Sequence, residues 1–137
     1  PPRAGVPRPV RLATRARAAE DGGLAPLCVV LDLDHTLVYS QDTVGQGYDF
    51  SFTKGNQAAY VWKRPGLDGL LSWLRQSCVE AVVYTAASSS YAEGVSRHLD
   101  PEGTLFRRRL SRRDCPLTPP AKDLLRLGRD MRRTVLV

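Results

Sequence analysis

Two aspartates, Asp32 and Asp34, stand one residue apart directly after a short apolar run over residues 27–30. The apolar run predicts a buried strand, and side chains two residues apart on a strand lie on the same face, about 7 Å from each other. Neighbouring carboxylates repel each other and are costly to desolvate, so a cation or a proton-transfer role must offset that cost. The pattern indicates Mg²⁺-assisted phosphoryl transfer, with one aspartate as nucleophile and the other as general acid or base. On these residues alone, a turn or a helix cap is the competing interpretation.

Strands and helices are expected to alternate around these aspartates. Short apolar runs predict strands, leucines at helical spacing predict helices, and a turn at Lys54-Gly55-Asn56 predicts a β-hairpin. The expected elements are strands over 27–30, 79–84, 105–110 and 134–137, a hairpin over 48–62, and helices that open at 65–66, run over 88–99 and run over 122–130. This order predicts an α/β fold with a parallel sheet, in which the hairpin is a flap that can cover the aspartates.

Length and composition set the domain organisation. The chain has 137 residues, of which 42% are hydrophobic and 25% charged, as expected for one globular domain. Residues 1–24 are rich in arginine and proline, which predicts a disordered lead-in before a domain over 25–137. No apolar run reaches the length of a membrane span. Three cysteines without a C-x-x-C pair argue against a disulfide framework and a zinc site.

The net charge of +6 comes mainly from arginines clustered in the second half of the chain. Arginine suits bidentate recognition of phosphate, so an anionic partner and a solvated basic face are the two interpretations of this cluster. We expect no direct binding of nucleic acid, because no aromatic residues are interleaved with the arginines.

Four segments occur together in a characteristic order: Asp32-Leu33-Asp34-His35-Thr36-Leu37-Val38, Lys63-Arg64-Pro65-Gly66, Val83-Tyr84-Thr85-Ala86, and Lys122-Asp123-Leu124-Leu125-Arg126-Leu127-Gly128-Arg129-Asp130. In this order the chain resembles the small C-terminal-domain phosphatases (the FCP/SCP or NLI-interacting-factor-like branch) of the haloacid dehalogenase superfamily. The resemblance covers residues 26–137 and implies the Rossmann-like fold of that superfamily.

The resemblance implies a role for each matching polar residue. Asp32 is expected to be the nucleophile that becomes an aspartyl-phosphate, and Asp34 to protonate the leaving serine or threonine oxygen and then activate water. The Asp32 carboxylate and the Asp34 backbone carbonyl are expected to bind Mg²⁺. Thr36 is expected to orient the loop, Thr85 to donate its hydroxyl to the phosphoryl oxygens, and Lys122 to neutralise the phosphoryl group. Phosphoryl transfer consists mostly of positioning and charge neutralisation, which these groups supply.

Three further residues are expected on the substrate side of the site. Arg112 occupies the place where the resemblance implies a substrate-binding arginine. Tyr60 and Trp62, on the predicted hairpin, are expected to form an apolar wall that accepts a Pro-containing peptide, and packing against the sheet is the alternative for both rings.

The resemblance also implies an acidic pair directly after a strand like Thr134–Val137, and the first member of that pair completes the Mg²⁺ site. The chain stops at Val137. We therefore expect a C-terminally truncated domain that binds Mg²⁺ weakly and is poorly active as a fragment.

The leading functional hypothesis is a Mg²⁺-dependent protein serine/threonine phosphatase. The resemblance implies a substrate such as the phosphorylated repeat tail of RNA polymerase II or a related phosphoprotein, and a nuclear location. The alternative is a non-catalytic binding module resembling the mitochondrial import-translocase subunit of the same family, with a mitochondrial location. A third hypothesis is a small-molecule phosphatase, but no large cap is inserted between Thr36 and Thr85, which favours a macromolecular substrate.

Overall fold

The structure is a computed structural model that describes residues 25–116 and 121–137, so the expected lead-in over 1–24 lies outside the described residues. Four parallel strands form the central sheet, in the order β6-β5-β1-β7. They are β1 (Cys28–Leu31), β5 (Glu80–Tyr84), β6 (Phe106–Leu110) and β7 (Thr134–Leu136). Parallel pairing brings the carboxyl ends of the strands to one edge, where ligands bind in open α/β sheets. The predicted α/β fold with a parallel sheet is confirmed.

Strand β1 is buried on both faces, which explains its continuous apolar run. Val29 and Leu31 pack on one side of the sheet against the core that both helices contribute to. Cys28 and Val30 point to the other side and pack against a smaller cluster that includes Leu127. A strand covered on both faces does not show the alternation of a half-exposed strand.

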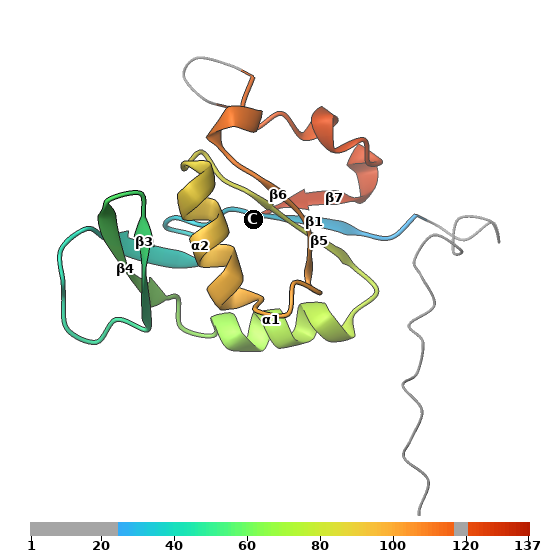
Figure 1. The fold of residues 1–137 in the computed structure, drawn as a ribbon. Helices are drawn as coiled ribbons and strands as arrows, with labels where there is room; N and C mark the ends of the chain where they lie inside the picture. The colour runs from blue at the N-terminus through green and yellow to red at the C-terminus, as the bar shows by residue number, and fades with distance from the viewer. Residues whose placement is uncertain (1–24, 117–120) are drawn as a thin grey trace, which may run out of the picture.

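Two helices, α1 (Leu67–Gln76) and α2 (Ser89–Leu99), cover one face of the central sheet (Figure 1). Helix α1 buries leucines along one side, as the sequence predicts. Helix α2 begins after Ser88, whose hydroxyl accepts a hydrogen bond from the backbone N–H of Tyr91. Both predicted helices are confirmed. Within the described residues, no helix is long and apolar enough to span a bilayer.

Short 3₁₀ helices follow β6: η2 (Arg112–Asp114), η3 (Leu124–Leu127) and η4 (Met131–Arg133). Leucines of η3 pack on the face of the sheet opposite α1 and α2. The prediction of a helix over 122–130 is wrong. The Asp123 carboxylate starts one turn by accepting from the N–H of Leu125, and Gly128 ends it in a left-handed conformation with φ of 61°. The segment therefore holds a single 3₁₀ turn instead of a continuous helix, and η4 follows it as a separate turn.

The predicted hairpin is part of a three-stranded antiparallel sheet, which we call the flap. Strands β3 (Phe50–Lys54) and β4 (Gln57–Lys63) form the hairpin, and β2 (Val38–Gln41) pairs with the other edge of β4. The hairpin prediction is confirmed. The sequence analysis does not predict β2, because only one of its four residues is buried and its sequence shows no apolar pattern. The flap extends from the carboxyl edge of the central sheet beside α2 (Figure 1).

A close contact between Phe52 and Gly94 fixes the flap against α2. A Cβ atom on Gly94 would lie only 2.2 Å from the Phe52 ring, so glycine permits this approach at the expense of helix propensity. One turn later, the ring of His98 stacks on Phe50 with centroids 4.4 Å apart. The distance between flap and helix therefore depends on a small residue at position 94.

Arg129 joins the segment after η3 to the amino end of β5. Its guanidinium donates to both carboxylate oxygens of Glu80, at 2.7 and 2.9 Å, and the Glu80 side chain is 8% exposed. These hydrogen bonds raise the pKa of Arg129 above its usual value. The pair links the two 3₁₀ turns to the central sheet.

We expect Arg129→Leu to lower the free energy of unfolding by about 2–3 kcal/mol, because the buried Glu80 carboxylate would lose its bidentate cation. Urea denaturation of the full-length protein measures the change. Arg97→Leu is the matched control, because Arg97 pairs with Glu93 at 2.7 Å on an exposed helix surface. Its expected cost is below about 0.5 kcal/mol. Equal costs for the two variants would contradict a structural role for the Arg129 pair.

Candidate active site

Asp32 and Lys122 form an ion pair at the carboxyl end of β1. Asp32 is the first residue after the strand, and the Nζ atom of Lys122 lies 2.7 Å from its Oδ2 atom. The backbone N–H of Leu33 donates to Oδ1 at 2.8 Å. The two side chains are 30% and 17% exposed, so the pair is partly shielded from water but open to a ligand. The structure thus brings together two expected site residues that are far apart in sequence.

The loop after β1 is a tight turn built on the carbonyl of Leu33. This oxygen accepts from the backbone N–H groups of Thr36 and Val38, at 3.2 and 3.0 Å. His35 adopts a left-handed conformation, with φ of 61°, and its carbonyl accepts a hydrogen bond from Arg64 at 2.9 Å. Arg64 thereby connects the Lys63-Arg64-Pro65-Gly66 segment to the aspartate loop, and Thr36 is half-buried within that loop.

Asp34 is bound by a residue that the sequence analysis missed. The hydroxyl of Tyr91 donates to Asp34 Oδ1 at 2.5 Å, and the Ser40 Oγ atom lies 2.8 Å from the same phenol oxygen. Burial raises the pKa of Tyr91, and its hydrogen bond to Asp34 raises it further. Tyr91 therefore remains a neutral donor near neutral pH. Its position in the first turn of the helix that follows Thr85 is the sequence signal that points to the site.

Thr85 is the first residue after β5 and is 1% exposed. Its backbone N–H donates to the carbonyl of Leu110, and its Oγ1 atom accepts from the N–H of Ala87 at 3.1 Å. A hydroxyl that accepts one hydrogen bond still has its own proton to donate. Since β1 and β5 are adjacent and parallel, Thr85 at the end of β5 lies near the start of the aspartate loop.

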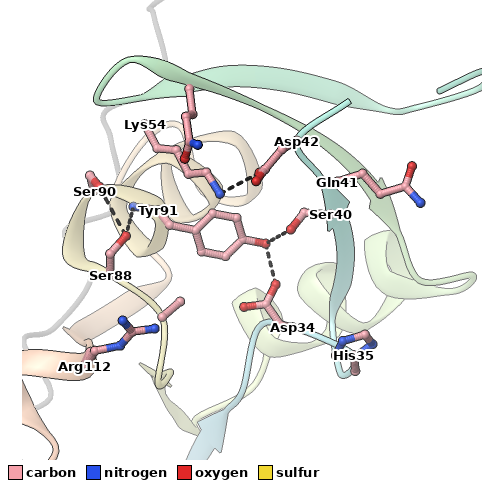
Figure 2. Close-up of a pocket in the computed structure, with 12 residues that line it drawn as sticks. Asp34, His35, Ser40, Gln41, Asp42, Lys54, Ser88, Ser90, Tyr91 and Arg112 are labelled. Carbon is pink, nitrogen blue, oxygen red and sulfur yellow. Dashed lines mark hydrogen bonds and ion pairs between the residues drawn. The ribbon is translucent and has the colours of Figure 1, made fainter. Parts of the chain in front are cut away.

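A cleft of about 550 Å³ lies between the flap and the first turn of α2. Its walls include Asp34, Ser40, Lys54, Ser88, Tyr91 and Arg112 (Figure 2). Arg112 reaches the cleft from the end of β6, where its Nε atom donates to the carbonyl of Ala86 at 2.8 Å. The structure thus brings Asp34 and Arg112, two residues that the sequence analysis expects at the site, to the walls of one cleft.

Tyr60 and Trp62 lie away from this cleft, on the outer face of the flap. Neither ring lines this cleft, and Trp62 instead lines a second, smaller cleft together with Tyr39 and Arg64. Both rings contact Tyr48, with centroids 5.2 Å from Tyr60 and 6.4 Å from Trp62. The structure therefore does not bring them together with Asp34 as a wall of its cleft.

Asp32 and Asp34 are the residues that fit a Mg²⁺ ion. In the described ranges, no group of three or more His, Cys, Asp or Glu residues is arranged to hold a metal. Mg²⁺ prefers hard oxygen ligands and is often bound by one or two carboxylates together with water and substrate phosphate. The Asp32 carboxylate and the backbone carbonyl of Asp34, two residues apart at the end of β1, are oxygen ligands of this kind.

Comparison with known proteins agrees with this geometry. Residues 27–137 match the family of NLI interacting factor-like phosphatases. The chain belongs to this family. Among its relatives is the mouse (Mus musculus) carboxy-terminal domain RNA polymerase II polypeptide A small phosphatase 2, which is 39% identical over 117 residues. The match covers 81% of this chain and 43% of the mouse protein, so the chain spans about two fifths of that relative.

Two other relatives extend the comparison. Phosphatase Herzog of Drosophila melanogaster is 37% identical over 116 residues, which are 80% of this chain and 32% of the fly protein. A solved structure of Fcp1, described as an essential RNA polymerase II CTD phosphatase, superposes with a TM-score of 0.69 at 27% identity. That superposition covers 88% of this chain and 38% of Fcp1. The family and its haloacid-dehalogenase-like fold are thus established for this chain.

Proposed function

We propose that this chain carries the catalytic residues of a Mg²⁺-dependent protein serine/threonine phosphatase that works through an aspartyl-phosphate. The observation that supports this most strongly is the different pairing of two neighbouring carboxylates. Asp32 is paired with the ammonium of Lys122, whereas Asp34 is bound by the neutral hydroxyl of Tyr91. Two carboxylates in different surroundings suit the separate roles of nucleophile and proton donor.

In the first step, a carboxylate oxygen of Asp32 attacks phosphorus and the bond from phosphorus to the serine or threonine oxygen breaks. Asp34, in its protonated form, gives a proton to that leaving oxygen, so the alcohol departs neutral. Tyr91 holds the Asp34 carboxyl group in place at 2.5 Å. The product is a phosphoryl group covalently attached to Asp32.

In the second step, Asp34 accepts a proton from a water molecule as the water oxygen attacks phosphorus. The bond between phosphorus and the Asp32 oxygen breaks, inorganic phosphate leaves, and the Asp32 carboxylate is regenerated. Asp34 thus returns to the protonated state in which it began.

The developing charge is met by groups around Asp32. Lys122 supplies a cation and Thr85 a hydroxyl proton, and Thr36 stabilises the loop that carries both aspartates. Bound through Asp32 and Asp34, Mg²⁺ would supply further positive charge for the phosphoryl oxygens. Arg112, on the wall of the cleft, is proposed to bind the substrate.

We also propose a phosphorylated protein as the partner. The names of the relatives point to the carboxy-terminal domain of RNA polymerase II, which supports that domain or a related phosphoprotein as substrate and the nucleus as location. The flap and the first turn of α2 border the cleft, and among the described residues no further segment lines it except the aspartate loop and Arg112, which leaves it accessible to a peptide.

The test is phosphate release by the full-length protein from p-nitrophenyl phosphate and from phosphoserine peptides. Activity should disappear with EDTA and return with added Mg²⁺. Binding of phosphopeptides without any turnover would contradict the proposal and favour the non-catalytic binding module.

Tyr91 acts in this scheme as a positioning residue for Asp34. We expect Tyr91→Phe to lower kcat about tenfold with KM changed less than about twofold, because the ring remains but Asp34 loses its donor. Tyr48→Phe is the control, since this tyrosine lies on the outer face of the flap and is 41% exposed. If Tyr91→Phe lowered the thermal unfolding midpoint together with kcat, or raised KM without lowering kcat, the positioning role would be contradicted.

A further inference from the structure

The cleft beside Asp34 is unusually polar for a site that takes a peptide. Apart from the Tyr91 ring and the methyl group of Ala87, the side chains that line it end in hydroxyl, amide, imidazole or charged groups. Tyr39 and Tyr48 contact Trp62 on the outer face of the flap. Phe50 and Phe52 pack against α2 and do not line the cleft. The substrate residue next to the phosphorylated one therefore meets polar groups.

An ion pair forms the flap side of the cleft. The Nζ atom of Lys54, at the end of β3, lies 2.8 Å from Oδ1 of Asp42, which directly follows β2. Lys54 is 24% exposed and Asp42 58% exposed. Figure 2 shows the pair on the flap side of the Tyr91 ring, with Arg112 across the cleft.

Lys54 lies over the ring of Tyr91, the residue that positions Asp34. The Lys54 Nζ atom lies 5.5 Å from the centroid of the Tyr91 ring, and the hydroxyl of that same ring binds Asp34. When Asp34 protonates the leaving oxygen, a residue adjoining the phosphorylated one must pass beside Lys54 and Asp42. The charges and hydrogen-bonding groups of Lys54 and Asp42 therefore determine which flanking residue fits.

The ion pair distinguishes between substrate residues that flank the phosphorylated one by the hydrogen bonds their side chains can form with Lys54 and Asp42. A proline ring would shield part of both charged groups from water and offer them no hydrogen bond in return. A side-chain amide can accept from Lys54 and donate to Asp42 at the same time. A carboxylate would be repelled by Asp42, and a cationic side chain by Lys54 and Arg112.

We propose that the Lys54–Asp42 pair makes this cleft select phosphoserine or phosphothreonine flanked by an uncharged hydrogen-bonding side chain, best an amide, and disfavour a flanking proline. The inference rests on the proposed phosphatase function and narrows its substrate class. Within that class, it favours phosphoproteins with polar sequences around the phosphorylated residue over Ser-Pro repeats.

The test uses the full-length protein with Mg²⁺ and matched phosphoserine peptides that differ only in the residue on either side of the phosphoserine. Gln, Pro, Glu and Lys are compared at each position by kcat/KM. On one side at least, Gln should exceed Pro about tenfold and also exceed Glu and Lys. Equal values, or a preference for Pro, would overturn the inference.

A double variant, Asp42→Leu with Lys54→Met, assigns the preference to the pair. The ratio of kcat/KM for Gln over Pro should fall to about one or below, and a ratio within one variant does not depend on how much of the protein is folded. Lys63→Met with Asp68→Leu is the matched control, because that pair (2.9 Å) lies outside the cleft. An unchanged ratio in the cleft variant would overturn the assignment. Absence of turnover on p-nitrophenyl phosphate and on every peptide would instead reject the phosphatase function itself.

Discussion

Replacing Asp32 with Asn is expected to lower kcat by a factor on the order of 10⁴ or more, because the side-chain amide lacks a nucleophilic carboxylate oxygen. The substitution preserves the shape of the side chain and an oxygen that can accept from the N–H of Leu33. It removes the negative charge beside Lys122, which is 2.7 Å away. The loss should therefore appear in the chemical step and not in folding.

Steady-state kinetics with p-nitrophenyl phosphate and a phosphoserine peptide measure this loss, with circular dichroism as the check on folding. Asp68→Asn is the matched control, because that carboxylate is 76% exposed and pairs with Lys63 outside the cleft. Its kcat should equal that of the wild-type protein. If Asp32→Asn retained as much as one tenth of the wild-type kcat, a nucleophilic role for Asp32 would be wrong.

Replacing Asp34 with Asn is expected to separate the two steps of the reaction. p-Nitrophenolate leaves without being protonated, so phosphorylation of Asp32 should continue in this variant when p-nitrophenyl phosphate is the substrate. Hydrolysis of the phosphoenzyme needs a base and should slow by about 10²–10⁴. Stopped-flow absorbance should show a burst of one nitrophenolate per active site, followed by slow turnover.

With a phosphoserine peptide, the same variant should show no burst. The serine oxygen is a poor leaving group that needs the proton from Asp34, so the first step is slow as well. A burst with both substrates, or unchanged turnover with both, would contradict the assignment of Asp34 as general acid and base.

The central strands were predictable because burial on both faces leaves a continuous apolar run. In β1 every residue is buried, and in β5 the four residues from Ala81 to Tyr84 are buried apolar side chains. Asp32 and Asp34 stand out because charged residues interrupt such a run at its end. In contrast, the contact of Lys122 with Asp32 follows from the resemblance, since no local pattern links residues 90 positions apart.

The failures also have physical causes. The helical spacing of Leu124 and Leu127 suggests a continuous helix, but Asp123 and Gly128 cap a single turn. Strand β2 gave little signal because it lies at the edge of the flap and buries only Val38.

The faces of the flap were the hardest feature to predict. Alternation along β4 separates Tyr60 and Trp62 from the buried Ala59 and Val61, but it does not tell which face borders the cleft. That choice is made by tertiary packing, through the contact of Phe52 with Gly94. The same packing brings Tyr91 to Asp34, and the only sequence signal for this contact is the place of Tyr91 in the first turn of the helix after Thr85.

The most direct test of the account is to identify the residue that becomes phosphorylated. The Asp34→Asn protein is mixed with p-nitrophenyl phosphate and Mg²⁺, stopped within the burst, and reduced with borohydride, which converts an acyl phosphate to an alcohol. Peptide mass spectrometry should then find homoserine at position 32 and at no other aspartate, with Asp32→Asn protein as the blank. Modification at another residue, or a complete burst without any modified residue, would contradict Asp32 as the nucleophile.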